Sequence, residues 1–374
     1  MPTPITIFTA ELHHGGTERQ IVALAKGLRL RGHEVRVVSY GKGIFDEELI
    51  AAGVEMHYAN RRGALGAFGF LWRLARLLRT LKPAVIYSFL GTPNIYLALL
   101  KPLLGGATIV WGVRASYVET SRYGIASSFA AWLEARLSRK ASLIIANSHA
   151  GREWAIKRGF AADKIVVIEN GIDTDRFKYD EEGRRRVRSE FGLKDHERLI
   201  VQVGRLDVMK DHPTFLKACA ILAAEDDSLR FACVGGGEAA YSDFLATLAD
   251  RLGLHDKLIW TGARDDISAI YSSSSASSSS SFGEGFSNTI AEAMSCGVVC
   301  AVTDVGDSAL IVGDLGFVAP PRDPKALANA LRQSLNLAQN DPDLNAKLRS
   351  SIESRFSLDR MVERTEAVLE QTRR

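Results

Sequence analysis

The sequence predicts an α/β protein built from two parallel-sheet domains, and three observations support this prediction. The chain has 374 residues, which is too long for one ordinary hydrophobic core. Each half alternates short apolar runs with longer amphipathic segments, as strands and helices do in parallel sheets. In each half, glycine-containing loops follow the first apolar run, at the end of a strand where such sheets bind ligands.

The first half begins with a predicted strand at Ile5–Thr9, followed by a His-His-Gly-Gly loop and a helix at Thr17–Leu30. Gly32 ends this helix, and Glu34–Ser39 is the next strand. Further strands are expected at Val85–Ser88, Thr108–Val113, Leu143–Asn147 and Ile165–Ile168.

Asn170-Gly171 is a turn signal, and the polar stretch Asp173–Arg188 after it predicts the domain junction. We therefore expect an N-terminal domain over residues 1–172 and a C-terminal domain over 173–357. The last segment, 358–374, is predicted to be a helix that crosses back to the first domain.

The second half repeats the alternation of strands and helices. Strands are expected at Leu199–Val203, Arg230–Val234, Lys257–Thr261 and Val298–Thr303, and helices at His212–Ala223 and Ala240–Leu252. Between them, residues 272–281 contain nine serines and one alanine. The composition of this run is that of a flexible linker, whereas its position requires a buried strand.

Composition restricts the class of protein. An apolar fraction of 46% and a charged fraction of 24% are typical of a globular protein. The four cysteines form no C-x-x-C pair, which favours reduced, buried thiols and a cytoplasmic location. The sequence shows no signal peptide and no apolar run approaching the roughly 20 residues that span a bilayer.

Charge is distributed unevenly along the chain. Residues 1–180 carry 24 Lys and Arg against 15 Asp and Glu, and residues 181–374 carry 23 against 29. The basic excess concentrates in 61–82, where six cations alternate with aromatic and aliphatic residues. This stretch fits peripheral contact with an anionic membrane, or equally a packed helix whose basic face is solvated. Nucleic acid is not expected, because no recognised binding motif accompanies the charge.

The segment 283–297, GEGFSNTIAEAMSCG, contains the most informative motif. Glu284 lies in a glycine-flanked loop, and Glu292 lies eight residues later within a predicted helix. Ser287, Asn288 and Thr289 suit the start of that helix, whose free N–H groups and dipole favour an anion. The segment therefore predicts a phosphate site with one carboxylate at its mouth and another inside.

Two cations and a second glycine loop add to this motif. Arg205 and Lys210 follow the first strand of the second half, where a planar guanidinium and an ammonium suit a diphosphate. Gly15 and Gly16 open the first helix, beside His14. Alone, the two glycines are more typical of a tight turn.

A third glycine segment, Gly235-Gly236-Gly237 followed by Ala240, fits the G-x-G-x-x-A pattern of dinucleotide sites. It lies in the middle of a domain, and no acidic residue clearly ends the following strand. We therefore interpret it as a tight turn. The sequence shows no zinc peptidase, serine hydrolase or P-loop motif.

In this order the motifs resemble those of the family-4 retaining glycosyltransferases, which have the GT-B fold of two Rossmann-like domains facing a cleft. The resemblance covers nearly the whole chain. The matching segments are Gly15–Glu18, Arg31–Val35, Asn147-Ser148, Val167–Asp173 with Phe177, Val203–Leu206, Lys210-Asp211, and Glu284 with Glu292.

The resemblance implies a nucleotide-sugar donor, a UDP- or GDP-sugar, bound mostly by the C-terminal domain, with the acceptor on the N-terminal side. Arg205 and Lys210 would neutralise the diphosphate, Glu284 would bind the transferred sugar, and Glu292 the ribose. The remaining implied donor contacts are Gly285, Phe286, Ser287, Asn288 and Thr289, with Gly15 and Gly16 from the other domain and Arg264 near the base.

The implied activity is hexosyl transfer without a metal or other cofactor, to a glycan or lipid-linked intermediate of bacterial cell-surface polysaccharide synthesis. The implied location is cytoplasmic, with possible peripheral contact at the inner membrane face. Many family members have a histidine near the donor sugar where this chain has Arg114, so Arg114 is a candidate for sugar or acceptor contacts. His14, beside the Gly15-Gly16 loop, is another candidate. Open alternatives are a nucleotide-sugar epimerase of the same fold, a catalytically silent sugar-nucleotide-binding subunit and an NAD-dependent oxidoreductase.

Overall fold

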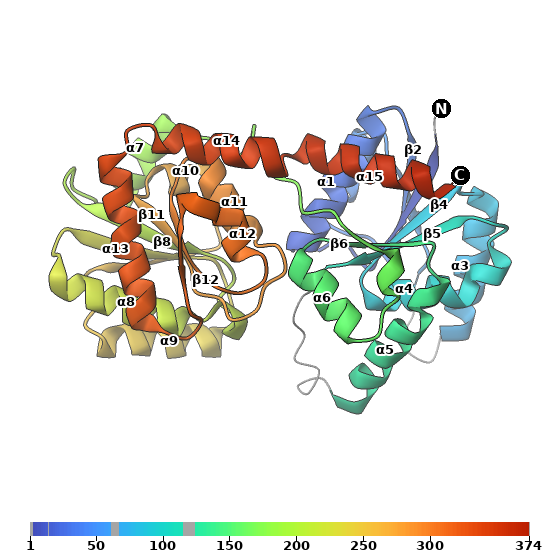
Figure 1. Cartoon of the computed structure of the whole chain (residues 1–374), viewed down its shortest axis with the longest axis horizontal. Helices are drawn as coiled ribbons and strands as arrows, with labels where there is room; N and C mark the ends of the chain where they lie inside the picture. Colours follow the sequence, from blue (N-terminus) through green and yellow to red (C-terminus); the bar gives the residue numbers. More distant parts are fainter. Residues whose placement is uncertain (1–2, 14, 61–66, 115–123, 374) are drawn as a thin grey trace. The chain divides into compact units, whose positions relative to one another are not determined.

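A computed structural model of the chain describes residues 3–13, 15–60, 67–114 and 124–373. The chain forms two compact units, Met1–Gly171 with Leu358–Arg374 and Ile172–Ser357. Each unit contains one parallel sheet with helices packed against it (Figure 1). The predicted α/β class with two parallel-sheet domains is confirmed.

The first unit contains a seven-stranded sheet in the order β3-β2-β1-β4-β5-β6-β7, in which every described pair of neighbours is parallel. Its strands are β1 Pro4–Phe8, β2 Glu34–Ser39, β3 Glu55–Tyr58, β4 Val85–Phe89, β5 Thr108–Val113, β6 Leu143–Ala146 and β7 Ile165–Val167. Its helices are α1 Gly16–Leu30, α2 Asp46–Ala51, α3 Ala67–Leu81, α4 Gly91–Leu100, α5 Gly124–Leu137, α6 His149–Lys157 and α15 Leu358–Arg373.

The second unit contains a six-stranded parallel sheet in the order β10-β9-β8-β11-β12-β13. Its strands are β8 Arg198–Val203, β9 Leu229–Val234, β10 Leu258–Gly262, β11 Ala276–Ser279, β12 Cys300–Thr303 and β13 Phe317–Ala319. Its helices are α7 Glu181–Glu190, α8 His212–Glu225, α9 Ala239–Arg251, α10 Ile267–Ser272, α11 Asn288–Ser295, α12 Ser308–Val312, α13 Pro324–Asn340 and α14 Leu344–Phe356.

In both sheets the direction of strand addition reverses beside the first strand, between β1 and β4 and between β8 and β11. Open α/β sheets bind ligands at the carboxyl ends of the strands at such a reversal. The topology therefore places one candidate binding edge in each unit.

Alternating side chains of the first sheet enter two separate cores. Residues such as Ile7 and Val37 pack with α1 and α15, whereas Phe8 and Val38 pack with α3, α4 and α5 on the opposite face. The C-terminal helix α15 belongs to this first unit and lies beside α1 (Figure 1). Gly27 permits this contact, because a Cβ atom there would come within 2.4 Å of a methyl group of Val362.

The serine run is not a flexible linker. It covers the end of α10, a turn and the strand β11, which pairs with β8 on one side and β12 on the other. Ser277, Ser278 and Ser279 are buried between these neighbours. The alternative suggested by position, a buried strand, is the one that the structure adopts.

The basic stretch 61–82 contains α3, and residues 61–66 lie outside the described part of the chain. Phe70, Leu74 and Leu78 of α3 are buried in the core, so its principal apolar face covers the sheet. Phe68 and Trp72 are instead 90% and 63% exposed. Among the described residues, no helix is both long enough and apolar enough to cross a bilayer.

Candidate functional site

The loops at the carboxyl edge of the second sheet bring the predicted catalytic residues together. Lys210 ends a short 3-10 turn, Val208–Lys210, after β8, and Glu284 lies in the loop after β11. Lys210 Nζ forms an ion pair with Glu284 Oε1, and Ser281 Oγ donates to the same oxygen at 2.7 Å. The two charged side chains are 25% and 12% exposed, so solvent screens this pair only partly.

Arg205 lies in the same β8 loop and is exposed. Within the described ranges, no carboxylate pairs with it, so its charge is available to a ligand. The glycines after β9 hold this loop. Leu206 N donates to Gly236 O at 2.8 Å, and a Cβ atom on Gly235 would come within 2.0 Å of Gly204 O. The triple glycine thus permits close backbone packing against the loop that carries Arg205, in agreement with the tight-turn interpretation.

The helix α11 begins at Asn288, directly after the Glu284 loop. Its N-cap residue, Ser287, makes no side-chain capping bond, and Ser287 Oγ instead lies 3.2 Å from Thr289 Oγ1. The amides of a first helical turn have no partner within the helix and attract anions. Glu292 is buried on the same helix.

Two further contacts fix the loop before α11. Asp307 N donates to Gly285 O at 2.9 Å, and Gly306, at φ +58°, lies so close that a Cβ atom would be 2.5 Å from Glu284 O. The Phe286 ring is buried and packs edge-on against Phe356, with 5.1 Å between ring centroids. The Phe286 ring is therefore a core anchor, and the predicted donor contact of Phe286 stays a prediction.

Arg264 is not brought to this cluster. Its guanidinium makes ion pairs with Glu190 and Asp266, and these hydrogen bonds hold its pKa above the ordinary arginine value. Both carboxylates would compete with a nucleotide base for the guanidinium. The predicted contact of Arg264 with the base stays a prediction.

Three predicted residues of the first unit, Gly15, Gly16 and Arg114, lie at the carboxyl edge of its own sheet. Gly15 is the N-cap of α1, and a Cβ atom there would meet the Glu18 carboxylate. Arg114 follows β5 and donates to Asn170 Oδ1 at 3.0 Å and to Tyr87 Oη at 3.1 Å. Gly16 is the first residue of α1, and His14 lies outside the described residues.

Sequence reasoning missed four residues around Glu284. Ser281 and Gly306 contact the loop as described above, and the Arg322 guanidinium stacks 4.4 Å above the centre of the Phe282 ring. Arg322 has φ +62°, which is unfavourable for a residue other than glycine. The sequence does not distinguish Ser281 from the other serines of its run. It also gives no indication that Arg322 and Phe282, 40 residues apart, are in contact.

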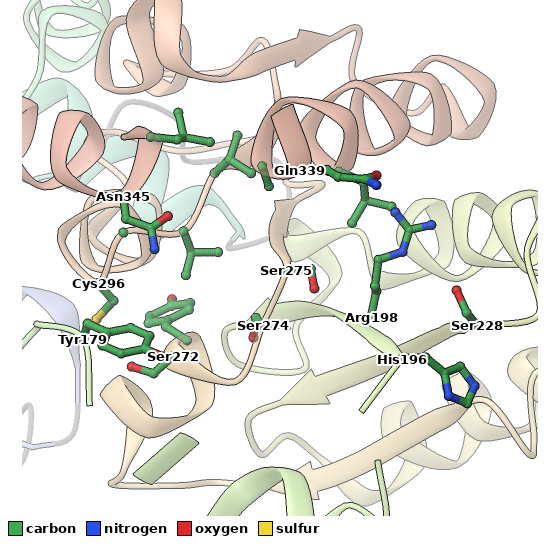
Figure 2. Close-up of a pocket in the computed structure, with 17 residues that line it drawn as sticks. Tyr179, His196, Arg198, Ser228, Ser272, Ser274, Ser275, Cys296, Gln339 and Asn345 are labelled. Atoms are coloured by element: carbon green, nitrogen blue, oxygen red, sulfur yellow. The ribbon is translucent and has the colours of Figure 1, made fainter. Parts of the chain in front are cut away.

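A cavity of about 670 Å³ lies at the opposite, amino-terminal edge of the second sheet (Figure 2). Its lining includes residues at or just before the starts of β8, β11 and β12, such as Arg198 and Ser275. Arg198 is paired with Asp226, and the Ser272 and Ser274 hydroxyls donate to carbonyls of α10. These three polar side chains are thus already engaged, and the predicted site residues of this unit lie at the other edge.

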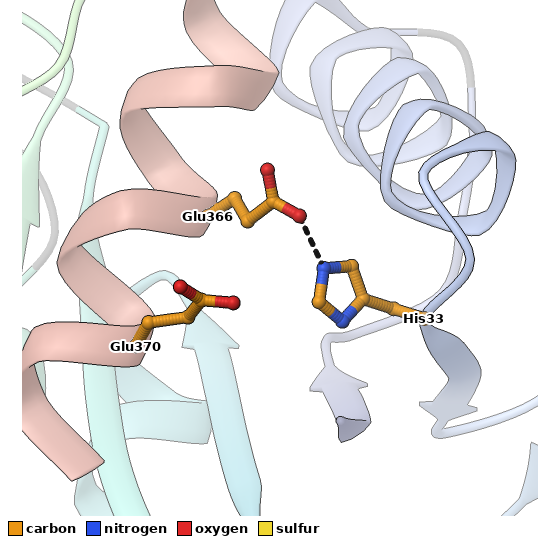
Figure 3. A group of neighbouring side chains, drawn as sticks. All are labelled: His33, Glu366 and Glu370. Atoms are coloured by element: carbon orange, nitrogen blue, oxygen red, sulfur yellow. Dashed lines mark hydrogen bonds and ion pairs between the residues drawn. The ribbon is translucent and has the colours of Figure 1, made fainter. Parts of the chain in front are cut away.

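His33, Glu366 and Glu370 form a second cluster, between the end of α1 and helix α15 (Figure 3). Thr3 N donates to His33 Nδ1 at 3.3 Å, so a neutral His33 has its proton on Nε2 and donates to Glu366 at 2.6 Å. Arg31 Nε donates to the other Glu366 oxygen at 2.5 Å. Arg31 and His33 thus both bind Glu366 of α15. The Arg-Gly-His segment at the end of α1 therefore attaches α15 to the rest of the first unit.

Two family models match the chain, one in each half. Residues 14–176 match Glycosyltransferase Family 4, and residues 197–336 match Glycosyl transferases group 1. Both models describe glycosyltransferases, and the two matches support a glycosyltransferase of the family-4 type. The group 1 match includes the Lys210–Glu284 pair and the start of α11.

Curated relatives are about one quarter identical to this chain over the residues that align. The N-acetylgalactosamine-N,N'-diacetylbacillosaminyl-diphospho-undecaprenol 4-alpha-N-acetylgalactosaminyltransferase of Campylobacter jejuni is 25% identical over 307 residues, 80% of each chain. The UDP-Gal:alpha-D-GlcNAc-diphosphoundecaprenol alpha-1,3-galactosyltransferase of Escherichia coli is 26% identical over 69% of this chain and 68% of its own. The D-inositol 3-phosphate glycosyltransferase of Streptomyces scabiei is 28% identical over 58% of this chain, which spans only 50% of that relative.

Solved structures show the same fold. Anabaena Alr3699/HepE in complex with UDP superposes with a TM-score of 0.87 at 20% identity, covering 99% of this chain and 100% of its own. The complex of the same protein with UDP-glucose gives a TM-score of 0.84 at 21% identity, covering 98% and 99%. The GT-B fold implied by the sequence resemblance is thereby confirmed.

Proposed function

We propose that this protein transfers a hexose from a nucleotide-diphospho-sugar, a UDP- or GDP-sugar, to an acceptor with retention of anomeric configuration. The observation that carries the proposal is the Lys210–Glu284 ion pair, held by Ser281 directly before the N-terminus of α11. A cation, a carboxylate and a helix N-terminus at one sheet edge suit a sugar linked to a diphosphate.

Each group has a distinct role in this proposal. Cleavage of the sugar–phosphate bond develops negative charge on the leaving diphosphate, which Lys210, Arg205 and the α11 amides stabilise. Glu284 positions the sugar and stabilises positive charge on it, and Glu292 binds the ribose. Because two cationic side chains lie in the loop after β8 at this edge, we propose that transfer needs no metal ion, which activity in excess chelator would test.

The relatives support a lipid-linked acceptor. The Campylobacter and Escherichia enzymes are named for transfer to diphospho-undecaprenol intermediates. We propose an acceptor of this class, a glycan attached to a lipid diphosphate, in the synthesis of a cell-surface polysaccharide. The donor proposal is supported by the UDP and UDP-glucose complexes of HepE, which has the same fold.

An acceptor of this kind requires access to a membrane. In the first unit, Phe68 and Trp72 of α3 and Phe129 and Trp132 of α5 are exposed, on helices that cover the same face of the sheet. Basic residues of α3, such as Arg76, accompany them. We propose peripheral contact with anionic lipid through these aromatics. Absence of co-sedimentation with anionic liposomes at low salt would contradict it.

The central test compares Arg205→Ala and Lys210→Ala with Lys217→Ala, a substitution of an exposed lysine on α8 in the same unit. A charge-assisted contact is worth about 1.5–3 kcal/mol, so each site variant should lose roughly tenfold to a hundredfold in donor turnover. Lys217→Ala should retain wild-type turnover. The donor is first chosen by thermal shift with UDP- and GDP-sugars, because a ligand stabilises the folded state by mass action.

Each outcome is informative. Wild-type turnover in both site variants would refute the assignment of Arg205 and Lys210. An isomerised donor without acceptor product would identify an epimerase, and donor binding without transfer across an acceptor panel would identify a silent binding subunit. Inverted product anomers in an NMR spectrum would refute retention.

A further inference from the structure

A cavity of about 520 Å³ lies within the first unit, at the carboxyl edge of its sheet. Its walls come from the ends of β1, β2, β4 and β5 and from α4, α5 and α6. The larger side chains of the wall are mainly apolar: Tyr40, Leu90, Ile95, Val113, Trp154 and Phe160. An apolar cavity with few polar groups is typical of a small-molecule site.

Leu90, in the wall of this cavity, has an unfavourable backbone conformation. It is the N-cap residue of α4 and has φ 74° and ψ 163°, a region that is almost restricted to glycine. Leu90 N is tied to Gly112 O, and Asn94 N to Leu90 O. The fold therefore holds a strained leucine at the cavity where glycine would be unstrained, and such strain is concentrated at ligand sites.

The charged groups of the cavity wall are fixed in place. Arg114 is held by Asn170 and Tyr87, and its guanidinium lies 4.7 Å from the centre of the Phe89 ring. Glu134 is buried and accepts a hydrogen bond from Asn94 Nδ2 at 3.0 Å. Burial raises the pKa of Glu134 despite this hydrogen bond, so its carboxyl is more readily neutral than an exposed one.

Arg158, a second cation in the wall, lies 3.9 Å from Glu134 Oε2 and donates to Ala131 O at 2.8 Å. Arg158 thus offsets the buried carboxyl, which leaves Arg114 as the cation available to an anionic group. The cavity therefore combines an apolar interior with one fixed cation.

The helix α5 faces the cavity on one side and carries exposed aromatic residues on the opposite side. Ala131 and Glu134, three residues apart on one face, line the cavity. Phe129 and Trp132, on the other face, are each 60% exposed and stack with 5.7 Å between ring centroids. The same helix therefore separates an apolar interior from an exposed aromatic surface.

We infer that this cavity binds the apolar chain of an isoprenoid phosphate, with its phosphate at Arg114. The inference rests on the proposed function, because it assigns the lipid end of the proposed acceptor to named residues. A volume of 520 Å³ corresponds to about 17 groups the size of a water molecule. The first three or four isoprene units of such a chain would fill it.

The size of the cavity predicts a dependence on chain length. Each buried methylene strengthens binding by about three- to fourfold. Affinity should therefore rise at least tenfold from geranyl phosphate to farnesyl phosphate and level off beyond geranylgeranyl phosphate. Calorimetric titration of the full chain, below the micelle concentration of each probe, measures this series, with inorganic phosphate as the headgroup control.

Variants separate the cavity from the outer surface of α5. Ala131→Phe places a ring at the cavity wall and should weaken farnesyl phosphate binding at least tenfold, whereas Ala240→Phe, at an exposed alanine on α9, should not. Leu90→Gly suits the backbone conformation but removes part of the wall, so it should weaken binding severalfold without preventing folding. The double variant Phe129→Ala/Trp132→Ala should retain the affinity.

Stabilisation by UDP and GDP is measured by thermal shift on the same proteins. It distinguishes failure of the cavity assignment from failure of the proposed transferase function. If UDP or GDP binds but affinity does not depend on chain length, or if Ala131→Phe and Leu90→Gly bind as wild type does, the cavity assignment is wrong and the proposed transferase stands. If only the Phe129/Trp132 double variant loses binding, the chain adsorbs to the surface and the assignment is also wrong. If neither nucleotide stabilises the wild type, the proposed function itself fails.

Discussion

Acid should destabilise this protein through a single buried histidine beside the proposed catalytic lysine. His212 is the first residue of α8, two positions after Lys210, and it is fully buried. Neither ring nitrogen has a hydrogen-bond partner among the described residues. Burial, and secondarily the charge of Lys210, lowers the pKa of His212 from 6.5 to about 4, against a smaller opposing effect of Asp207.

The size and sign of the effect follow from linkage. Because the folded pKa is below the unfolded one, the unfolded chain binds one more proton than the native state between pH 6.5 and 4. The contribution of neutral His212 to stability is fully present above pH 6.5 and is lost progressively as the pH falls toward 4. At about 1.4 kcal/mol per pKa unit, the shift costs about 3 kcal/mol. That is a large part of a typical stability of about 5–15 kcal/mol.

The assay is the free energy of unfolding in urea from pH 7.5 to 4, compared between wild type and His212→Leu. The difference between the two should change by about 3 kcal/mol across this range, because leucine does not titrate. His255→Leu removes an exposed histidine and controls for the loss of one titrating side chain. Lys210→Met should raise the pKa of His212, since it removes a nearby cation, and NMR of the imidazole C–H would show it. Parallel stability curves for wild type and His212→Leu would refute the reasoning.

Three further outcomes follow from backbone geometry and a second ion pair. Gly306→Ala should raise KM for the donor at least tenfold, because its Cβ would displace the Glu284 carbonyl; unchanged donor kinetics would contradict the close packing. Arg322→Gly and its control Lys82→Gly both relieve a left-handed φ and should raise unfolding free energy by about 0.5–1 kcal/mol, but only Arg322→Gly should alter donor or acceptor kinetics. Glu366→Gln should destabilise the protein at pH 7. Burial raises the pKa of Glu366, but its histidine and arginine partners lower it further, so the difference should be full above the unfolded pKa of 4.5 and shrink as the pH falls through the lower folded pKa. A difference that stays constant as the pH falls from 7 into the acid range would exclude this origin.

The fold was predictable where apolar periodicity is strong. The strands Glu34–Ser39 and Thr108–Val113 have the expected bounds, and most other expected strands differ by one or two residues. Two strands were missed, Glu55–Tyr58 and Phe317–Ala319. Both lie at a sheet edge and are only four and three residues long, so neither contains an apolar run long enough to predict a strand.

The site was predictable as an edge of a sheet but not as a set of contacts. Spacing placed Lys210 and Glu284 in loops at the same edge, because parallel strands end there together. It did not predict that they pair, nor that Arg264 is engaged by Glu190 and Asp266. Pairing depends on side-chain directions set by packing, whereas the motif spacing fixes only position along the chain.

The serine run, residues 272–281, shows how a segment with almost no apolar side chains can support the Glu284 loop. Ser280 Oγ lies within 2.9 Å of Lys210 O and Asp211 O, and Thr303 Oγ1 donates to Ser279 O from the next strand. A buried hydroxyl costs free energy unless it is bonded, and each satisfied bond contributes about 1 kcal/mol. Apolar side chains at the same positions would pack but could not bond the backbone of the Lys210 loop. The end of the run therefore couples the two proposed catalytic loops by hydrogen bonds, from Ser280 to the Lys210 loop and from Ser281 to Glu284.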